Sequence, residues 1–153
     1  MRVTGTATIR RPPTEVWTVI ADPATWPGWD PGVIEVHQVS PGPIAVGSRF
    51  QATVGDHEKL ETWIAEVKTV EIERELAFEV IEGAIRSTTV SYRLEPDGVG
   101  GSRVTREISP SLSGKARLLL PLFLVSAYRH RADEVMNLKR LIEAPGTSAP
   151  SSL

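Results

Sequence analysis

The sequence contains no cysteine, which excludes a disulfide framework, a thiolate metal site and a cysteine nucleophile. Histidine is scarce as well, and the three histidines at positions 37, 57 and 130 are too scattered for a zinc motif. The chain also lacks a nucleophile elbow and a phosphate-binding loop. We therefore expect no metal and no cofactor, and the sequence assigns no catalytic residue.

An excess of charge of one sign is also lacking. The net charge is −2 and the sequence pI is near 5.9, so nucleic acid is not an expected partner. The N-terminus has no apolar segment typical of a signal peptide, which predicts a cytoplasmic protein. The apolar run Ala116–Tyr128 is shorter than the ~20 residues that span a bilayer, and Pro121 interrupts it. Stable membrane insertion is therefore not expected.

The N-terminal third changes its periodicity twice. Residues Arg2–Arg10 alternate small or apolar with polar side chains, which predicts a half-buried strand. Residues Pro12–Asp22 place apolar side chains at helical spacing behind two prolines, which predicts a short helix. The following stretch, Pro23–Gly32, combines proline and glycine with Trp26 and Trp29, and predicts a second, broken helix or a structured loop. The two rings either plug one end of the core or line a cavity.

The middle of the chain has the pattern of strands alone. Six segments rich in strand-forming residues are separated by turn-forming residues: Val33–Val39, Ser48–Val54, Lys59–Val70, Leu76–Ile81, Ala84–Leu94 and Ser102–Ile108. With the first strand they make about seven strands in a meander, and their short connections require antiparallel pairing. The length predicts one domain over residues 1–144, and the aperiodic residues 145–153 predict a disordered tail.

The segment Leu112–Glu143 predicts one long amphipathic helix, which Pro121 should kink or divide from a separate first turn. The apolar stripe expected to face the sheet is Pro121, Leu124, Val125, Tyr128, Ala132, Val135, Met136 and Ile142. The opposite, polar face is His130, Asp133, Glu134, Asn137 and Arg140. Because the first third is apolar nearly all round, we expect other elements to cover it on most sides.

Together these elements predict the α+β class, an antiparallel sheet with one face covered by helices. Four segments, Pro12–Trp29, Val46–Phe50, Gly100–Thr105 and Asn137–Glu143, resemble the polyketide cyclase/dehydrase branch of the START-like (SRPBCC) superfamily. The resemblance implies a helix-grip fold: a curved sheet wrapped around the C-terminal helix, with two short helices after strand one. It also implies a hydrophobic cavity between sheet and helix.

The alternation of side chains along the predicted strands indicates which polar residues face this cavity. Arg86 and Arg106 should share the concave face with apolar neighbours, and Glu61 on another strand could offset their charge. The alternative is that the strand ends extend into solvent and these are ordinary surface charges. The full set of candidate ligand-binding residues is Trp26, Trp29, Glu61, Trp63, Arg86, Tyr92, Arg106, Leu124 and Tyr128.

Two functions from different classes fit these features. The first is a binding protein, monomeric or homodimeric, that holds a hydrophobic small molecule such as a lipid, a polyketide or a quinone-like compound. The second is a cyclase/dehydratase-type enzyme that uses the same cavity, with Glu61, Arg86, Arg106 and Tyr128 as polar participants. A third, weaker hypothesis is an interaction subunit that exposes Leu118–Leu124 to a protein partner.

Overall fold

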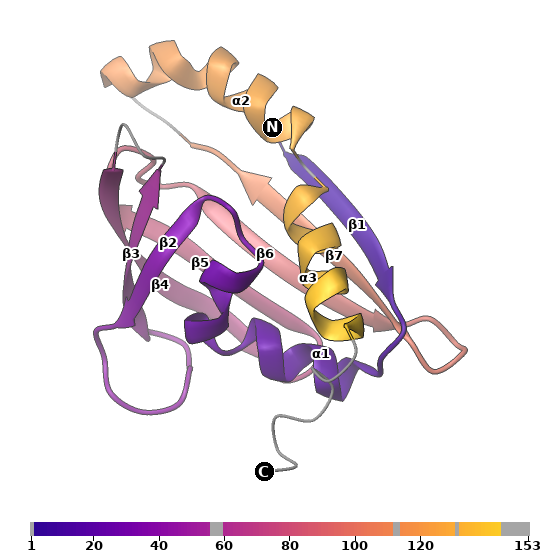
Figure 1. Ribbon diagram of the computed structural model, residues 1–153. Helices are drawn as coiled ribbons and strands as arrows, with labels where there is room; N and C mark the ends of the chain where they lie inside the picture. The colour runs from indigo at the N-terminus through magenta and orange to yellow at the C-terminus, as the bar shows by residue number, and fades with distance from the viewer. Residues whose placement is uncertain (1, 56–59, 112–113, 131, 145–153) are drawn as a thin grey trace.

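The computed structural model describes residues 2–55, 60–111, 114–130 and 132–144 (Figure 1). The strands are β1 (Val3–Ile9), β2 (Val33–Gln38), β3 (Arg49–Gly55), β4 (Leu60–Glu71), β5 (Glu75–Glu82), β6 (Thr89–Pro96) and β7 (Ser102–Ser109). The helices are α1 (Pro13–Ile20), the 3-10 helix η1 (Pro23–Gly28), the 3-10 helix η2 (Gly114–Leu119), α2 (Leu120–Arg129) and α3 (Asp133–Glu143). The predicted disordered tail, 145–153, lies outside the described residues.

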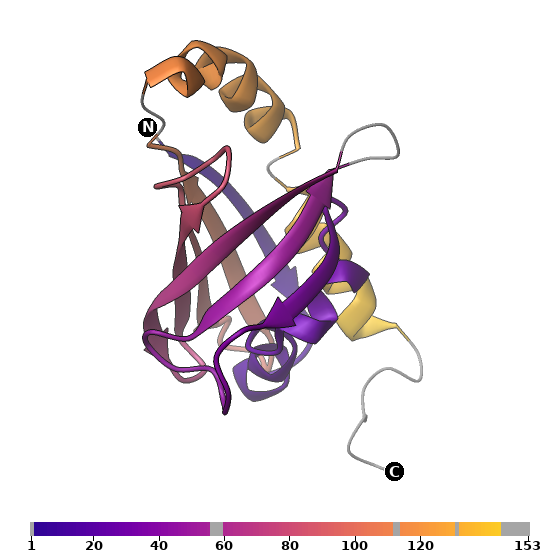
Figure 2. The same ribbon diagram turned by 90° about the vertical axis from the view of Figure 1, so that its left-hand side faces the viewer.

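All seven strands form one antiparallel sheet in the order β1-β7-β6-β5-β4-β3-β2, and the sheet is strongly curved (Figure 2). The α+β helix-grip class is thus confirmed, with α1 and η1 following the first strand. The prediction of a simple meander is wrong for β1, which pairs with β7, from Val3 opposite Ile108 to Ile9 opposite Ser102. The two helices carry the chain from β1 across to the other edge of the sheet, where β2 begins.

The concave face of the sheet holds the core. Strand alternation is regular on β1, where every second residue is buried, and the large buried rings gather on η1 and the central strands. Trp26 stacks on Phe78 with ring centroids 5.3 Å apart and meets Phe50 edge-on at 4.7 Å. The Trp26 indole also donates a hydrogen bond to the Ile20 carbonyl oxygen at 3.0 Å, which satisfies the buried N–H.

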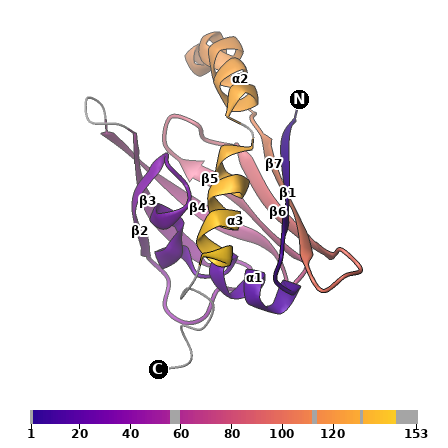
Figure 3. The ribbon, with the colours of Figure 1, turned by 45° about the vertical axis from the view of Figure 1, so that its right-hand side comes forward.

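The C-terminal helix is not continuous, so the prediction of one long helix is wrong (Figure 3). Helix α2 ends at Arg129 and α3 begins at Asp133, with Ala132 as its N-cap at φ −101° and ψ −7°. His130 bridges the break through its Nδ1 atom, 2.7 Å from Asp133 Oδ2. The predicted division near Pro121 is present: η2 ends at Leu119, and Pro121 lies in the first turn of α2, where its missing N–H is tolerated.

The break also changes which residues of this region are buried. Val135, Leu138 and Ile142 of α3 are buried, as expected for two of the three. Val125 and Tyr128 of α2, predicted to face the sheet, are 60% and 62% exposed. The expectation that other elements cover the apolar first third is therefore also wrong. Because α3 takes a new direction after the break, a helical phase counted from Tyr128 does not carry over to it.

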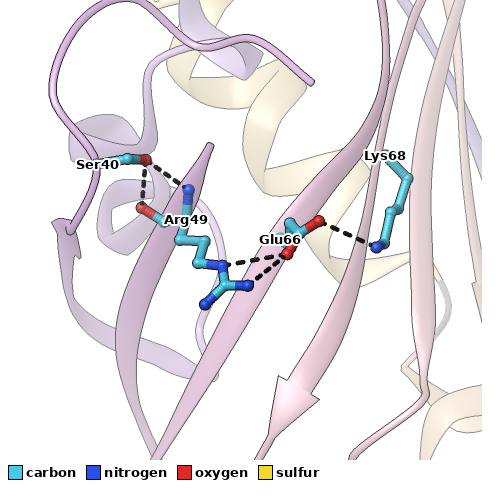
Figure 4. Close-up of polar contacts among 4 residues, drawn as sticks. All are labelled: Ser40, Arg49, Glu66 and Lys68. Carbon is cyan, nitrogen blue, oxygen red and sulfur yellow. Dashed lines mark hydrogen bonds and ion pairs between the residues drawn. The ribbon is translucent and has the colours of Figure 1, made fainter. Parts of the chain in front are cut away.

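A network of polar side chains on the surface connects β3 with β4 and with the loop before β3 (Figure 4). Arg49 lies opposite Glu66 in the strand register and contacts its Oε2 through Nε at 3.1 Å and Nη2 at 3.0 Å. Lys68 Nζ donates to the other carboxylate oxygen at 3.2 Å, and the Ser40 hydroxyl accepts from the Arg49 backbone N–H at 2.7 Å. The lysine and arginine hydrogen bonds lower the pKa of Glu66.

Candidate ligand-binding site

Arg106 is the central residue of the interior polar site. It lies on β7 between the inward-facing Val104 and Ile108, opposite Tyr92 of β6. Only 12% of its side chain is exposed, and its Nε donates to the Tyr92 hydroxyl at 3.3 Å. Parity reasoning placed Arg106 correctly, because β6 and β7 pair without a bulge over this region.

Two carboxylates from other elements face this arginine. Glu134, in the first turn of α3, places Oε2 3.8 Å from Arg106 Nη1, and that buried oxygen has no hydrogen-bond partner in the described structure. Asp30 follows η1, and its Oδ1 accepts the Gly32 backbone N–H at 3.0 Å. We call Asp30, Tyr92, Arg106 and Glu134 the Arg106 cluster. Its members come from a loop, two neighbouring strands and the C-terminal helix.

Burial dominates the electrostatics of the cluster. Desolvation raises the pKa of Asp30 and of Glu134 above their ordinary values, although Arg106 opposes the shift in each case. Desolvation also raises the pKa of Tyr92 to about 12, so the phenol stays neutral. For Arg106 burial alone would lower the pKa, but Tyr92, Glu134 and Asp30 more than offset it and the arginine remains charged. The cluster thus holds one permanently charged arginine and two carboxyl groups whose ionisation is disfavoured by burial.

Two cavities meet at this cluster. The outer cleft, of about 480 Å³, opens between β7, the 31–32 loop and the junction of α2 with α3. Its lining is Pro31, Gly32, Arg106, Ile108, Ser126, Ala127, His130, Asp133 and Glu134. The inner cavity, of about 80 Å³, lies deeper among aromatic and aliphatic side chains. Arg106 and Ile108 line both cavities and separate them.

The structure places seven of the nine predicted site residues in three groups. Four of them line the inner cavity: Trp26, Trp63, Tyr92 and Arg106. Trp29 is buried beside them, edge-on to Tyr92 at 5.5 Å. Leu124 is half-buried and Tyr128 exposed on α2, and neither lines the outer cleft or the inner cavity.

The predicted cluster of Glu61, Arg86 and Arg106 does not form. Glu61 lies on the same side of its strand as the buried Trp63, but it is the second residue of β4 and is only half-buried, opposite Val54. Arg86 is exposed in the turn between β5 and β6, because β6 begins only at Thr89. Gly83 starts that turn at φ +123°, where a Cβ would stand 2.7 Å from Trp63 Cβ.

Sequence reasoning missed Asp30 and Glu134 as members of the site. Asp30 lies in the loop after η1, where its Oδ1 accepts the Gly32 backbone N–H, and no periodic pattern in the sequence directs its side chain toward the cavity. Glu134 was assigned to the polar helix face. A helical stripe counted from Val135, Leu138 and Ile142, all three of which are buried, could have found it. Glu134 lies one turn before Leu138 and therefore borders that stripe.

The fold and the position of the site together define a class of protein. A curved antiparallel sheet around a C-terminal helix, with a cleft between them, is a helix-grip protein. The chain belongs to the polyketide cyclase/dehydrase and lipid transport family, whose family model matches residues 1–143. This confirms the family that the sequence motifs indicated.

Solved structures with the same fold are distant in sequence. A protein from Thermus thermophilus matches with a TM-score of 0.75 and 18% identity over 92% of this chain and 95% of its own. The di-domain ARO/CYC BexL from the BE-7585A biosynthetic pathway matches with a TM-score of 0.75 and 16% identity; the match covers 95% of this chain and 48% of BexL. The Aha1 dimer from Colwellia psychrerythraea matches with a TM-score of 0.62 and 12% identity over 94% of this chain and 97% of its own. No curated protein sequence matches.

Proposed function

We propose that the protein binds a hydrophobic small molecule that carries neutral oxygen atoms, such as a polyketide, a quinone-like compound or a lipid with hydroxyl groups. The position of Arg106 at the junction of the outer cleft and the inner cavity carries this proposal. A ligand that enters the cleft reaches a buried guanidinium before it reaches the aromatic interior. The family description, which names polyketide cyclisation and lipid transport, supports the same class of ligand.

The size of the two cavities supports a ligand seated mainly in the outer cleft. Its volume of about 480 Å³ falls within the range of roughly 300–1,000 Å³ common to small-molecule sites. The inner cavity, at about 80 Å³, admits only a small end of the ligand, in contact with Trp26, Trp63 and Phe78. The bulk of the molecule then lies against Ile108, Ala127 and the first turn of α3.

The charges of the Arg106 cluster argue for neutral ligand oxygens over a carboxylate. Arg106 already faces Asp30 and Glu134, and the pKa of both carboxyl groups is raised by burial. An anionic ligand would have to share the single guanidinium with two acidic groups in a desolvated site, which is costly. A carbonyl or hydroxyl oxygen instead accepts a hydrogen bond from the guanidinium without adding charge.

The first prediction tests this role of Arg106. Titration with neutral 1,4-naphthoquinone, followed by quenching of tryptophan fluorescence, should saturate for the native protein. Arg106→Met should weaken binding by roughly tenfold or more, since a hydrogen bond to a charged group contributes ~1.5–3 kcal/mol. Arg86→Met, which removes an exposed arginine, is the matched control and should leave affinity unchanged. The anion 2-naphthoate should bind more weakly than the quinone.

Equal affinity of the two arginine variants, with native circular dichroism for both, would show that Arg106 contacts no ligand. Stronger binding of 2-naphthoate than of naphthoquinone would contradict the choice of neutral oxygens. Both results are read from the same titrations, so a failure of the ligand chemistry is distinguished from a failure of the site.

A second candidate function is catalysis of a cyclisation or dehydration in the same cleft. The observation that favours it is the pair of carboxyl groups, Asp30 and Glu134, which lie near a charged arginine and whose pKa is raised by burial toward the range useful for general acid–base catalysis. Such a pair could donate a proton to a carbonyl oxygen and remove one from carbon. Asp30→Asn should then abolish turnover of a poly-carbonyl substrate and leave its binding intact, whereas a pure binding protein shows no turnover to abolish.

A further inference from the structure

Helix α2 presents an apolar stripe to solvent. Leu118 near the end of η2 is 82% exposed, and Leu122 and Val125 are 70% and 60% exposed. Their spacing of four and three residues places them on one side of the helix, and Tyr128 continues the same side. Figures 1 and 2 show α2 at one end of the sheet, where it contacts β1 and leaves its other side open. The stripe is therefore an accessible surface of the folded protein.

The charge around this stripe is of one sign. From residue 108 to residue 132 the sequence has four basic residues, Lys115, Arg117, Arg129 and Arg131, and no acidic residue. The whole chain has a net charge of −2, so the remainder of the molecule is acidic. In the sequence the basic residues stand in pairs before and after the apolar stripe. An apolar helix face between basic residues has the composition of helices that lie in a lipid–water interface.

We propose that α2 docks on an anionic lipid surface, with Leu118, Leu122 and Val125 between the headgroups and with Arg117 and Arg129 on lipid phosphates or carboxylates. At ten residues α2 is too short to cross a bilayer, and no helix in the described part of the chain is long and apolar enough to do so. The helix therefore lies along the surface. A second copy of the chain is a poorer occupant, because two such basic segments face to face repel each other.

The docked orientation would bring the outer cleft to the membrane. Ser126 and Ala127 of α2 line the cleft, whereas the stripe lies on the exposed side of the same helix. One helix thus forms both a wall of the cleft and the contact with lipid. The docking surface itself does not depend on what the cleft binds, so its test stands apart from that of the proposed function.

The experiment is co-sedimentation of the purified full chain with lipid vesicles. We expect binding to phosphatidylcholine vesicles that contain about one third phosphatidylserine, weak binding to pure phosphatidylcholine, and loss of binding at high salt. Leu122→Glu should weaken binding to the anionic vesicles at least about tenfold. Val99→Glu is the matched control, since Val99 is also apolar and 87% exposed but lies in the β6–β7 turn, and it should bind as the native protein does.

Both substitutions replace exposed side chains, and circular dichroism should confirm that both variants are folded. Equal binding of the Leu122→Glu and native proteins would overturn the proposal, as would no binding to either vesicle. Sedimentation equilibrium tests the alternative that a second copy of the chain covers the stripe. If the native protein is a dimer that Leu122→Glu dissociates, and neither protein binds vesicles, the stripe is a dimer interface and the lipid proposal is overturned.

Discussion

Arg106 shows how a charged residue is kept inside an apolar core. Its desolvation is offset by the Tyr92 hydroxyl and by two acidic groups, yet the ion pair with Glu134 is long at 3.8 Å and leaves one carboxylate oxygen without a hydrogen bond. A buried pair with such geometry contributes little to stability and can even reduce it. A polar group that the fold retains at a stability cost, next to two cavities, is more consistent with ligand contact than with structural support.

The raised pKa of Glu134 leads to a prediction about pH. A carboxyl group whose pKa is higher in the folded than in the unfolded state favours folding below its ordinary pKa of 4.5, and this contribution is lost as pH rises through the folded-state pKa. Gln at position 134 does not titrate. Urea denaturation measures the effect. As pH rises from about 4 to about 7, the unfolding free energy of Glu134→Gln should increase relative to that of the native protein.

Glu66→Gln provides a control of opposite sign. Hydrogen bonds from Lys68 and Arg49 lower the pKa of Glu66, so its contribution to stability is present above the ordinary pKa and is lost as pH falls. Over the same rise in pH, the unfolding free energy of Glu66→Gln should decrease relative to that of the native protein. A difference between Glu134→Gln and native protein that does not change with pH would show that Glu134 is not desolvated in the fold.

At this scale the sequence predicted the strand residues of the site better than the others. Alternation correctly gave the inward orientation of Trp63, Tyr92 and Arg106, because a period of two is reliable within a paired strand. It misplaced Arg86, because nothing in the sequence pattern shows that the turn after Gly83 delays β6 until Thr89. Asp30 reaches the site through a loop, where no periodicity exists to place a side chain.

Among the elements, the break between α2 and α3 is the least predictable feature. No proline or glycine lies between Arg129 and Asp133, so local propensity favours a continuous helix there. The strands, by contrast, were predicted to within a few residues, apart from the late start of β6, since turn-forming residues separate them. The pairing of β1 with β7 is a long-range choice that no local pattern specifies.

Another prediction tests the orientation of α3. Val135 is fully buried, so Val135→Asp would place a charge without a partner in the core and should destabilise the fold by about 4 kcal/mol or more. Asp133, two residues earlier, is exposed and pairs with His130, and Asp133→Ala should change stability by ~0.5 kcal/mol or less. Chemical denaturation distinguishes the two, and coinciding midpoints would contradict the described orientation of α3.

For the molecule as a whole, the main contrast is between a packed helix-grip core and an outlying α2. The core buries η1, α1 and α3 against the curved sheet, whereas the exposed large hydrophobic residues in the described last third of the chain belong to η2 and α2. Stability is therefore unevenly distributed, because α2 buries only part of its apolar surface, through Leu124 and Ala127, whereas the core elements bury most of theirs.

Hydrogen exchange followed by mass spectrometry should reveal this contrast. We expect backbone amides of α2 to exchange at least roughly tenfold faster than those of α3 and of strands β4–β7. Helix α3 is the internal control, since it has similar length and follows directly in the chain. Equal protection of the two helices would indicate that α2 packs on the core in solution. Slower exchange in the presence of anionic vesicles would locate the lipid contact on this helix.

The pairing of β1 with β7 has a consequence for how the protein folds. Val3 lies opposite Ile108, so β1 precedes its partner strand by most of the described chain and can pair only after β7 has been synthesised. Strands β2 to β7 can form hairpin by hairpin as they leave the ribosome, but β1 has to wait until the seventh strand exists. During that wait its alternating Val3, Ala7 and Ile9 remain unpaired. We therefore expect the pairing of β1 with β7 to form late in folding, and β1 to be open to mispairing until then.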